Sequence, residues 1–78
     1  MTKPNLGEIK FLLTSILNKK DSTLRQKVLG DVMELLSLNE MHYTWAEKAL
    51  KEEIKGDIVK ANAWIEKILD EVDEEEYE

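Results

Sequence analysis

Residues 39–69 read NEMHYTWAEKALKEEIKGDIVKANAWIEKIL, and this stretch decides the fold because it contains the pattern of two helices joined by a tight turn. Asn39 is a good N-terminal cap, and apolar residues then recur at helical spacing over residues 40–55. Gly56 is a natural helix terminator, and Asp57 can cap the helix that follows. The sequence therefore predicts a helical hairpin here.

Two further helices are expected before this hairpin. Asn5 can cap the first, whose six apolar residues fall within an arc roughly 140° wide at helical spacing. The second is expected from about Thr23 to Leu38, and its apolar residues cover roughly 220° of arc, which is typical of a helix in the centre of a bundle or of one that faces a second chain. Because the connections are only a few residues long, consecutive helices should pack antiparallel.

These patterns predict an all-α protein, a compact bundle of four short helices arranged as two helical hairpins. A chain of 78 residues forms one domain, and it contains no Cys and one His. A small domain without disulfides or a structural metal depends on helix packing or self-association for its stability. We expect the bundle to occupy residues 1–69, and we expect a flexible acidic tail over residues 70–78 that continues from the last helix and frays there.

The hairpin also carries small residues at particular places. Ala49 follows Trp45 by four residues, Gly56 closes the first helix, and Ala61 and Ile65 follow in the second. Over residues 45–69 this pattern resembles a tetratricopeptide-type helical hairpin, although no Pro closes the unit. The resemblance implies protein–protein interaction rather than catalysis, and no binding residue is carried over from it.

Charge is distributed very unevenly along the chain. The chain has 17 acids and 11 bases, and seven of the acids lie in residues 70–78. The remainder then holds 10 acids against 11 bases, so a nearly neutral body carries a strongly negative terminus. Blocks of like charge stay solvated and often act as interaction tails. We therefore interpret this segment as a docking element for a basic surface of another protein.

Catalytic and metal-binding patterns are weak in this sequence. His42 is the single imidazole, whereas a structural zinc site needs four ligands. No serine stands in a nucleophile elbow, and no glycine-rich phosphate loop occurs. We expect a protein that is not an enzyme and that has neither a cofactor nor a metal site.

The function that these features favour is a small acidic interaction module, acting as a regulator, inhibitor or adaptor of a larger basic or nucleic-acid-binding protein. Phe11 falls on the polar side of the first helix, so it is expected at an interface. Trp45 and Trp64 are expected in the core, or otherwise as anchors for a partner. The predicted partner-binding residues are Phe11, Met33, Trp45, Trp64, Asp70, Glu71, Asp73, Glu74, Glu75, Glu76, Tyr77 and Glu78.

Two alternatives remain open at this point. A structural homodimer or assembly subunit with a solubilising tail would also explain the wide apolar arc of the second helix. A nucleic-acid-binding regulator is less favoured, because the chain is acidic, and it would contact phosphate through the first interhelical turn. The residues of that turn are Lys19, Lys20, Arg25 and Lys27. No apolar run is long enough for a signal peptide or membrane span, so we expect a soluble cytoplasmic protein.

Overall fold

The computed structural model describes the backbone of residues 6–37 and 39–75, and the side chains of residues 7–37 and 39–72. This part of the chain forms four helices, which confirms the predicted all-α four-helix bundle. Their bounds are α1 Leu6–Asn18, α2 Ser22–Leu35, α3 Glu40–Lys55 and α4 Ile58–Glu75. The predicted cap at Asn5 lies outside the described residues.

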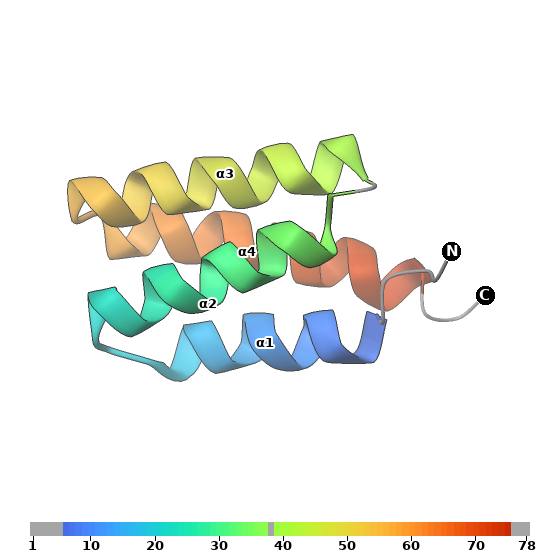
Figure 1. The fold of residues 1–78 in the computed structure, drawn as a ribbon, viewed down its shortest axis with the longest axis horizontal. Helices are drawn as coiled ribbons and strands as arrows, with labels where there is room; N and C mark the ends of the chain where they lie inside the picture. The colour runs from blue at the N-terminus through green and yellow to red at the C-terminus, as the bar shows by residue number, and fades with distance from the viewer. Residues whose placement is uncertain (1–5, 38, 76–78) are drawn as a thin grey trace.

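The helices run up and down in sequence order (Figure 1). Each helix packs against two neighbours, so that α1 contacts α2 and α4, and α3 contacts α2 and α4. The α1–α2 and α3–α4 turns lie together at one end of the bundle, and the α2–α3 connection lies at the other. We call these the turn end and the opposite end, because this arrangement determines where the charges meet.

Local side-chain and backbone bonds fix the helix ends. Asp21 and Asn39 accept hydrogen bonds from the backbone N–H groups of Thr23 and His42, over 2.9 Å and 3.0 Å. Gly56 adopts the left-handed conformation, with φ of 90°, and its N–H donates to the carbonyl of Glu53. A glycine reaches this region without the steric cost that a Cβ imposes. The caps predicted at Asn39 and Gly56 are therefore confirmed.

The second helix is shorter than predicted. It ends at Leu35 rather than near Leu38, and Leu36 and Ser37 form a turn. The N–H of Asn39 donates to the carbonyl of Leu36, which closes that turn. The capping role of Asn39 explains the early ending, because a residue that caps α3 takes an extended conformation and cannot continue α2.

The core is a single apolar cluster with contributions from every helix. Most of the wide apolar arc of α2 is used inside the bundle, since Leu29 and Val32 are buried and Val28, Met33 and Leu35 pack partly against the core. Leu24 is the exception on this helix, with 48% of its surface exposed. The arc therefore reflects a helix between two neighbours, α1 and α3.

The predicted boundary after residue 69 falls inside α4. This helix continues to Glu75, and Val72 is a fully buried member of the core. The helix thus continues past residue 69, as the sequence predicts for a tail that continues from the last helix, and its buried apolar face reaches Val72. Residues 76–78 lie outside the described part.

Candidate functional site: the tryptophan–lysine face of α3 and α4

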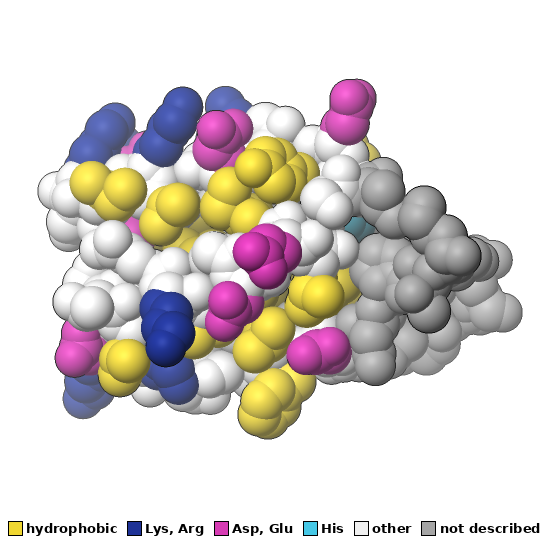
Figure 2. All heavy atoms as spheres, in the orientation of Figure 1, with side chains coloured by type: hydrophobic (Ala, Val, Ile, Leu, Met, Phe, Trp, Pro, Cys, Tyr) yellow, Lys and Arg dark blue, Asp and Glu magenta, His cyan; other side chains and the backbone are white. Residues whose placement is uncertain are grey.

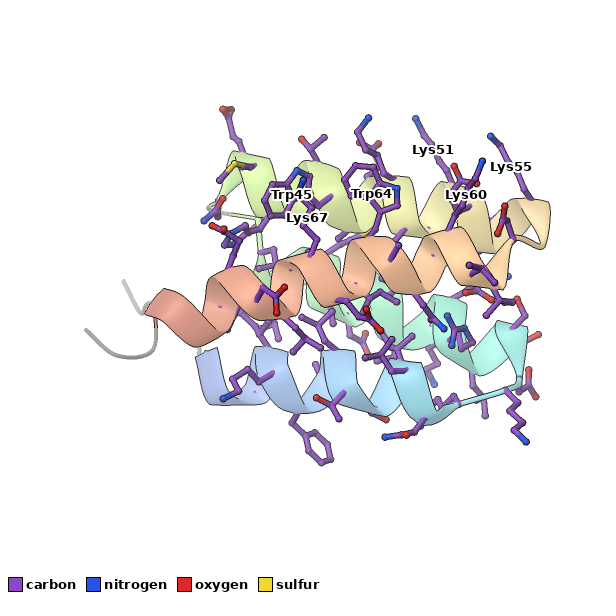
Figure 3. The ribbon with its side chains drawn as sticks, turned by 180° about the vertical axis from the view of Figure 1, so that it is seen from behind. Trp45, Lys51, Lys55, Lys60, Trp64 and Lys67 are labelled. Carbon is purple, nitrogen blue, oxygen red and sulfur yellow. The ribbon has the colours of Figure 1, made fainter. Side chains whose placement is uncertain are left out.

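Two tryptophans lie side by side along the line where α3 and α4 meet (Figure 3). Trp45 on α3 and Trp64 on α4 are half-buried, and both pack against the core. The Nζ of Lys67 lies 4.8 Å from the ring centroid of Trp45 and 5.6 Å from that of Trp64. One ammonium group therefore bridges the two indoles.

A second lysine continues this arrangement on the α3 side. The Nζ of Lys48 lies 5.5 Å from the ring centroid of Trp64. Each such cation–π contact contributes about 0.5–1 kcal/mol at an exposed site. Lys48 and Lys67 thus place two ammonium groups over the indole rings.

Three more lysines lie between the two tryptophans and the α3–α4 turn (Figure 3). Lys51, Lys55 and Lys60 are exposed, and none of them forms an ion pair with another residue that the structure describes. Glu52 and Glu71 lie on the same side of their helices by helical spacing, and they reduce the net positive charge. The tryptophan–lysine face comprises Trp45, Lys48, Lys51, Lys55, Lys60, Trp64 and Lys67.

The apolar residues predicted to bind a partner do not form one patch. Phe11 lies on α1 with 71% of its surface exposed, whereas Met33 on α2 is half-buried against the core. Trp45 and Trp64 share the tryptophan–lysine face, and α1 and α2 do not border the line where α3 and α4 meet. Phe11 is therefore an isolated aromatic on a different side of the bundle.

Five of the predicted acidic residues, at positions 70, 71, 73, 74 and 75, belong to the last part of α4, at the opposite end of the bundle from the α1–α2 and α3–α4 turns. Asp70 is exposed, and Glu71 is half-buried with its Oε1 3.9 Å from Nε2 of His42. Asp73, Glu74 and Glu75 are helical, but their side chains lie outside the described part. The same is true of all atoms of Glu76, Tyr77 and Glu78.

The basic first turn differs from its predicted role at one residue. Lys20 and Lys27 are exposed, and the Nζ of Lys19 donates to Oγ of Ser15 over 2.9 Å. Arg25, in contrast, is only 1% exposed. Its prediction as a phosphate contact is wrong, because the guanidinium points into the bundle and donates four hydrogen bonds there.

Arg25 forms a buried polar network that joins all four helices. Its Nε donates to Oε1 of Glu53 on α3 over 2.8 Å, and its Nη2 donates to Oδ1 of Asn62 on α4. Its Nη1 donates to the carbonyls of Ile16 and Lys19 at the end of α1. The carbonyl of Ile16 also accepts a hydrogen bond from the N–H of Lys19 over 3.0 Å, so the guanidinium adds a second donor to it.

The carboxylate of Glu53 is satisfied on its other side as well. Its Oε2 accepts a hydrogen bond from Oγ of Ser22, the first residue of α2, over 2.8 Å. The pair and its partners thus tie the turn end of the bundle together. A buried pair of this kind is a structural element, and it offers no open position to a ligand.

Charge is segregated along the bundle as a result of the fold. Figure 2 shows the side of the bundle opposite to the tryptophan–lysine face, where the Lys and Arg side chains gather toward the turn end and the Asp and Glu side chains are spread along the described surface. The exposed lysines around the α1–α2 turn share that end with Lys51, Lys55 and Lys60 of the tryptophan–lysine face, whereas Asp70 and Glu71 lie at the other. The sequence analysis recognised the first lysine group but missed the second.

Comparison with family models, with curated proteins and with solved structures finds no match to this chain. Within residues 6–37 and 39–75, no helix combines the length and the apolar character needed to cross a membrane. The same part of the chain holds no cluster of three or more His, Asp or Glu side chains placed to hold a metal ion.

Proposed function

We propose that this protein is a small non-enzymatic interaction module that regulates, inhibits or adapts a larger protein by docking its acidic end on a basic surface. The observation that carries the proposal is the segregation of charge along the bundle, with exposed lysines at the turn end and Asp70 and Glu71 at the opposite end. A local field of one sign steers a partner of the other sign, even where the net charge of the whole chain is modest.

Phe11 supports the second part of the mechanism. It is a large aromatic with 71% of its surface in solvent, and it lies on the outer side of α1. Aromatic anchors in a desolvated contact dominate many interfaces, whereas the surrounding charges mainly set the association rate. We assign the long-range attraction to the acids of α4 and the residence time to Phe11.

The α3–α4 hairpin is consistent with this class of function. Gly56 closes it as in the tetratricopeptide-type hairpin that residues 45–69 resemble, and Ala49 and Ala61 are fully buried. Such hairpins commonly serve protein–protein interaction, which supports the proposal on independent grounds. Trp45 and Trp64 are covered in part by Lys48 and Lys67, so they contribute less free apolar surface than Phe11.

The test compares variants in affinity capture from the native cell extract, followed by titration of the purified captured protein. Replacing Asp70 and Asp73 by Asn, and Glu74 and Glu75 by Gln, removes four charges but keeps the buried Val72. We expect this variant to associate at least tenfold more slowly at low salt, since steering contributes factors of about ten to a thousand. Phe11→Ser should instead raise the dissociation rate.

The matched control removes four exposed acids elsewhere on the bundle. It combines Asp31→Asn, Glu34→Gln, Glu47→Gln and Glu66→Gln, all at exposed positions. This control should bind nearly as the natural sequence does. Equal retention of a captured protein by the α4 variant and by this control would contradict the proposal.

A further inference from the structure

The tryptophan–lysine face carries positive charge that the bundle does not neutralise. Lys51, Lys55 and Lys60 are exposed and lack ion pairs to the described residues, and they project from the same end of the α3–α4 hairpin (Figure 3). Beside them, Lys67 and Trp64 form a strip that is both cationic and apolar. A surface of this composition fits an acidic helix or segment that also offers some apolar contact.

The chain itself contains such an acidic segment, but α4 holds most of it away from these lysines. Five of the seven acids of residues 70–78 lie on α4 at positions 70, 71, 73, 74 and 75. With a rise of about 1.5 Å per residue, those acids lie about 15 to 22 Å along the helix axis from Lys60. The rigid helix therefore keeps them away from Lys60 and the neighbouring Lys51 and Lys55 of their own copy.

We propose that two copies of this chain associate side by side and antiparallel through their tryptophan–lysine faces, with the acidic end of each α4 against the exposed lysines of the other. The arrangement satisfies both charged ends at once, because a two-fold axis places each end of one copy over the other end of its partner. Trp64 and Lys67 lie near the middle of α4. They therefore fall near the two-fold axis, where the tryptophan–lysine faces of the two copies meet.

The size of the tryptophan–lysine face determines how stable the proposed dimer is expected to be. The bundle measures 35 × 20 × 18 Å, so one side has an outline of about 700 Å², and contact over only part of it would bury less than the roughly 800 Å² per partner of a standard stable interface. The dimer should therefore be weak. Because its main attraction is between exposed charges, it should also dissociate at high salt, where the screening length falls to about 3 Å.

The proposal is tested by sedimentation velocity at low and high salt over a wide range of protein concentration. We expect the natural sequence to form a dimer at low salt and a monomer at high salt. Lys51→Glu with Lys60→Glu should give a monomer under both conditions. The matched control, Lys20→Glu with Lys27→Glu, makes the same change of charge at two exposed lysines outside the face, and it should still form the dimer.

A charge exchange separates the specific pairing from a general effect of charge. Asp70→Lys with Asp73→Lys, Glu74→Lys and Glu75→Lys should also be monomeric alone, because residues 70–78 then carry four Lys against three acids and both ends of that variant are basic. An equimolar mixture with the Lys51→Glu, Lys60→Glu variant should form a heterodimer, since each acidic end meets a basic one. Circular dichroism of every variant establishes that the helices remain.

Three outcomes would overturn the proposal. These are a natural sequence that remains monomeric at low salt, a control pair that loses the dimer as completely as the face variant, and a mixture that fails to associate. If the natural sequence is monomeric and a single-stranded oligonucleotide quenches its tryptophan fluorescence in a Lys51- and Lys60-dependent way, the face binds nucleic acid instead. The lysine variants leave the acidic end intact, so this proposal can fail without affecting the proposed function.

Discussion

The Nε of Arg25 on α2 donates to Oε1 of Glu53 on α3 over 2.8 Å, and both side chains are almost completely withdrawn from water. Desolvating two charges costs several kcal/mol, and a buried pair offsets that cost only when its remaining donors and acceptors are also paired. Here they are paired, because Ser22 donates to the carboxylate and the guanidinium reaches acceptors on α1 and α4. The pair thus fixes how the four helices align at the turn end.

Removing the carboxylate should destabilise the bundle strongly. Glu53→Ala leaves the guanidinium of Arg25 buried without a counter-charge, and breaking a buried pair in this way costs about 3–5 kcal/mol. A chain of 78 residues has a total stability of only about 4–12 kcal/mol, so the loss should be evident in urea unfolding.

The neighbouring position provides the control for that experiment. Glu52 precedes Glu53 on α3, but it is only half-buried and has no ion pair to a described residue. Glu52→Ala should change the free energy of unfolding by no more than about 0.5 kcal/mol. If the two substitutions have equal effects, the buried pair does not stabilise the fold as argued.

A lysine cannot replace Arg25. The guanidinium reaches four acceptors from one planar fork, namely the carbonyls of Ile16 and Lys19, Oε1 of Glu53 and Oδ1 of Asn62. An ammonium group keeps the charge but presents its donors from a single point, so at least one buried acceptor loses its partner at a cost of about 1–3 kcal/mol. Arg25→Lys should lower the midpoint of thermal unfolding by several degrees, whereas the exposed Lys27→Arg should leave it unchanged. A similar midpoint for both variants would show that the fork geometry is unimportant.

The same substitution at two glycines should have opposite effects. Gly56 has a φ of 90°, so Gly56→Ala places a Cβ in the left-handed region and should cost about 1–2 kcal/mol. Gly30 lies inside α2, and a Cβ there meets no atom within 4 Å. Gly30→Ala should therefore stabilise the protein by about 0.5–1 kcal/mol through helix propensity. Chemical denaturation of both variants measures the difference, and a loss of stability at Gly30 would contradict the predicted sign.

The helices and their caps could be predicted because they depend on local sequence. Asn39 and Gly56 act on backbone groups within a few residues of themselves, so the bounds of α3 follow from the sequence. The Arg25–Glu53 pair could not be predicted in the same way, since it joins residues 28 positions apart whose meeting depends on how α2 aligns with α3. One signal was present, because each charge stands on the apolar stripe of its helix, four residues from Leu29 and Ala49 respectively.

The tryptophan–lysine face could not be predicted from the sequence for the same reason. Nothing in the sequence distinguishes Lys48 and Lys67 from the other lysines. They become part of the site because the antiparallel packing of α3 and α4 places them over Trp64 and Trp45. The acidic segment was recognised correctly as a block of charge. The buried stripe of α4 continues into this segment as far as Val72, so the packed core and the acidic segment overlap.

Two valines on α4 test that last point directly. Val72 is fully buried, whereas Val59 near the start of the same helix is 79% exposed. Val72→Ala removes buried methyl groups and leaves a small cavity, at a cost of about 2 kcal/mol, whereas Val59→Ala should change the stability by less than about 0.5 kcal/mol. Urea unfolding of both variants followed by tryptophan fluorescence measures the contrast. If Val72→Ala were as mild as Val59→Ala, the packed body would end near residue 69, and removal of residues 70–78 would leave the bundle intact. The structure requires the opposite, because such a truncation also removes a core side chain.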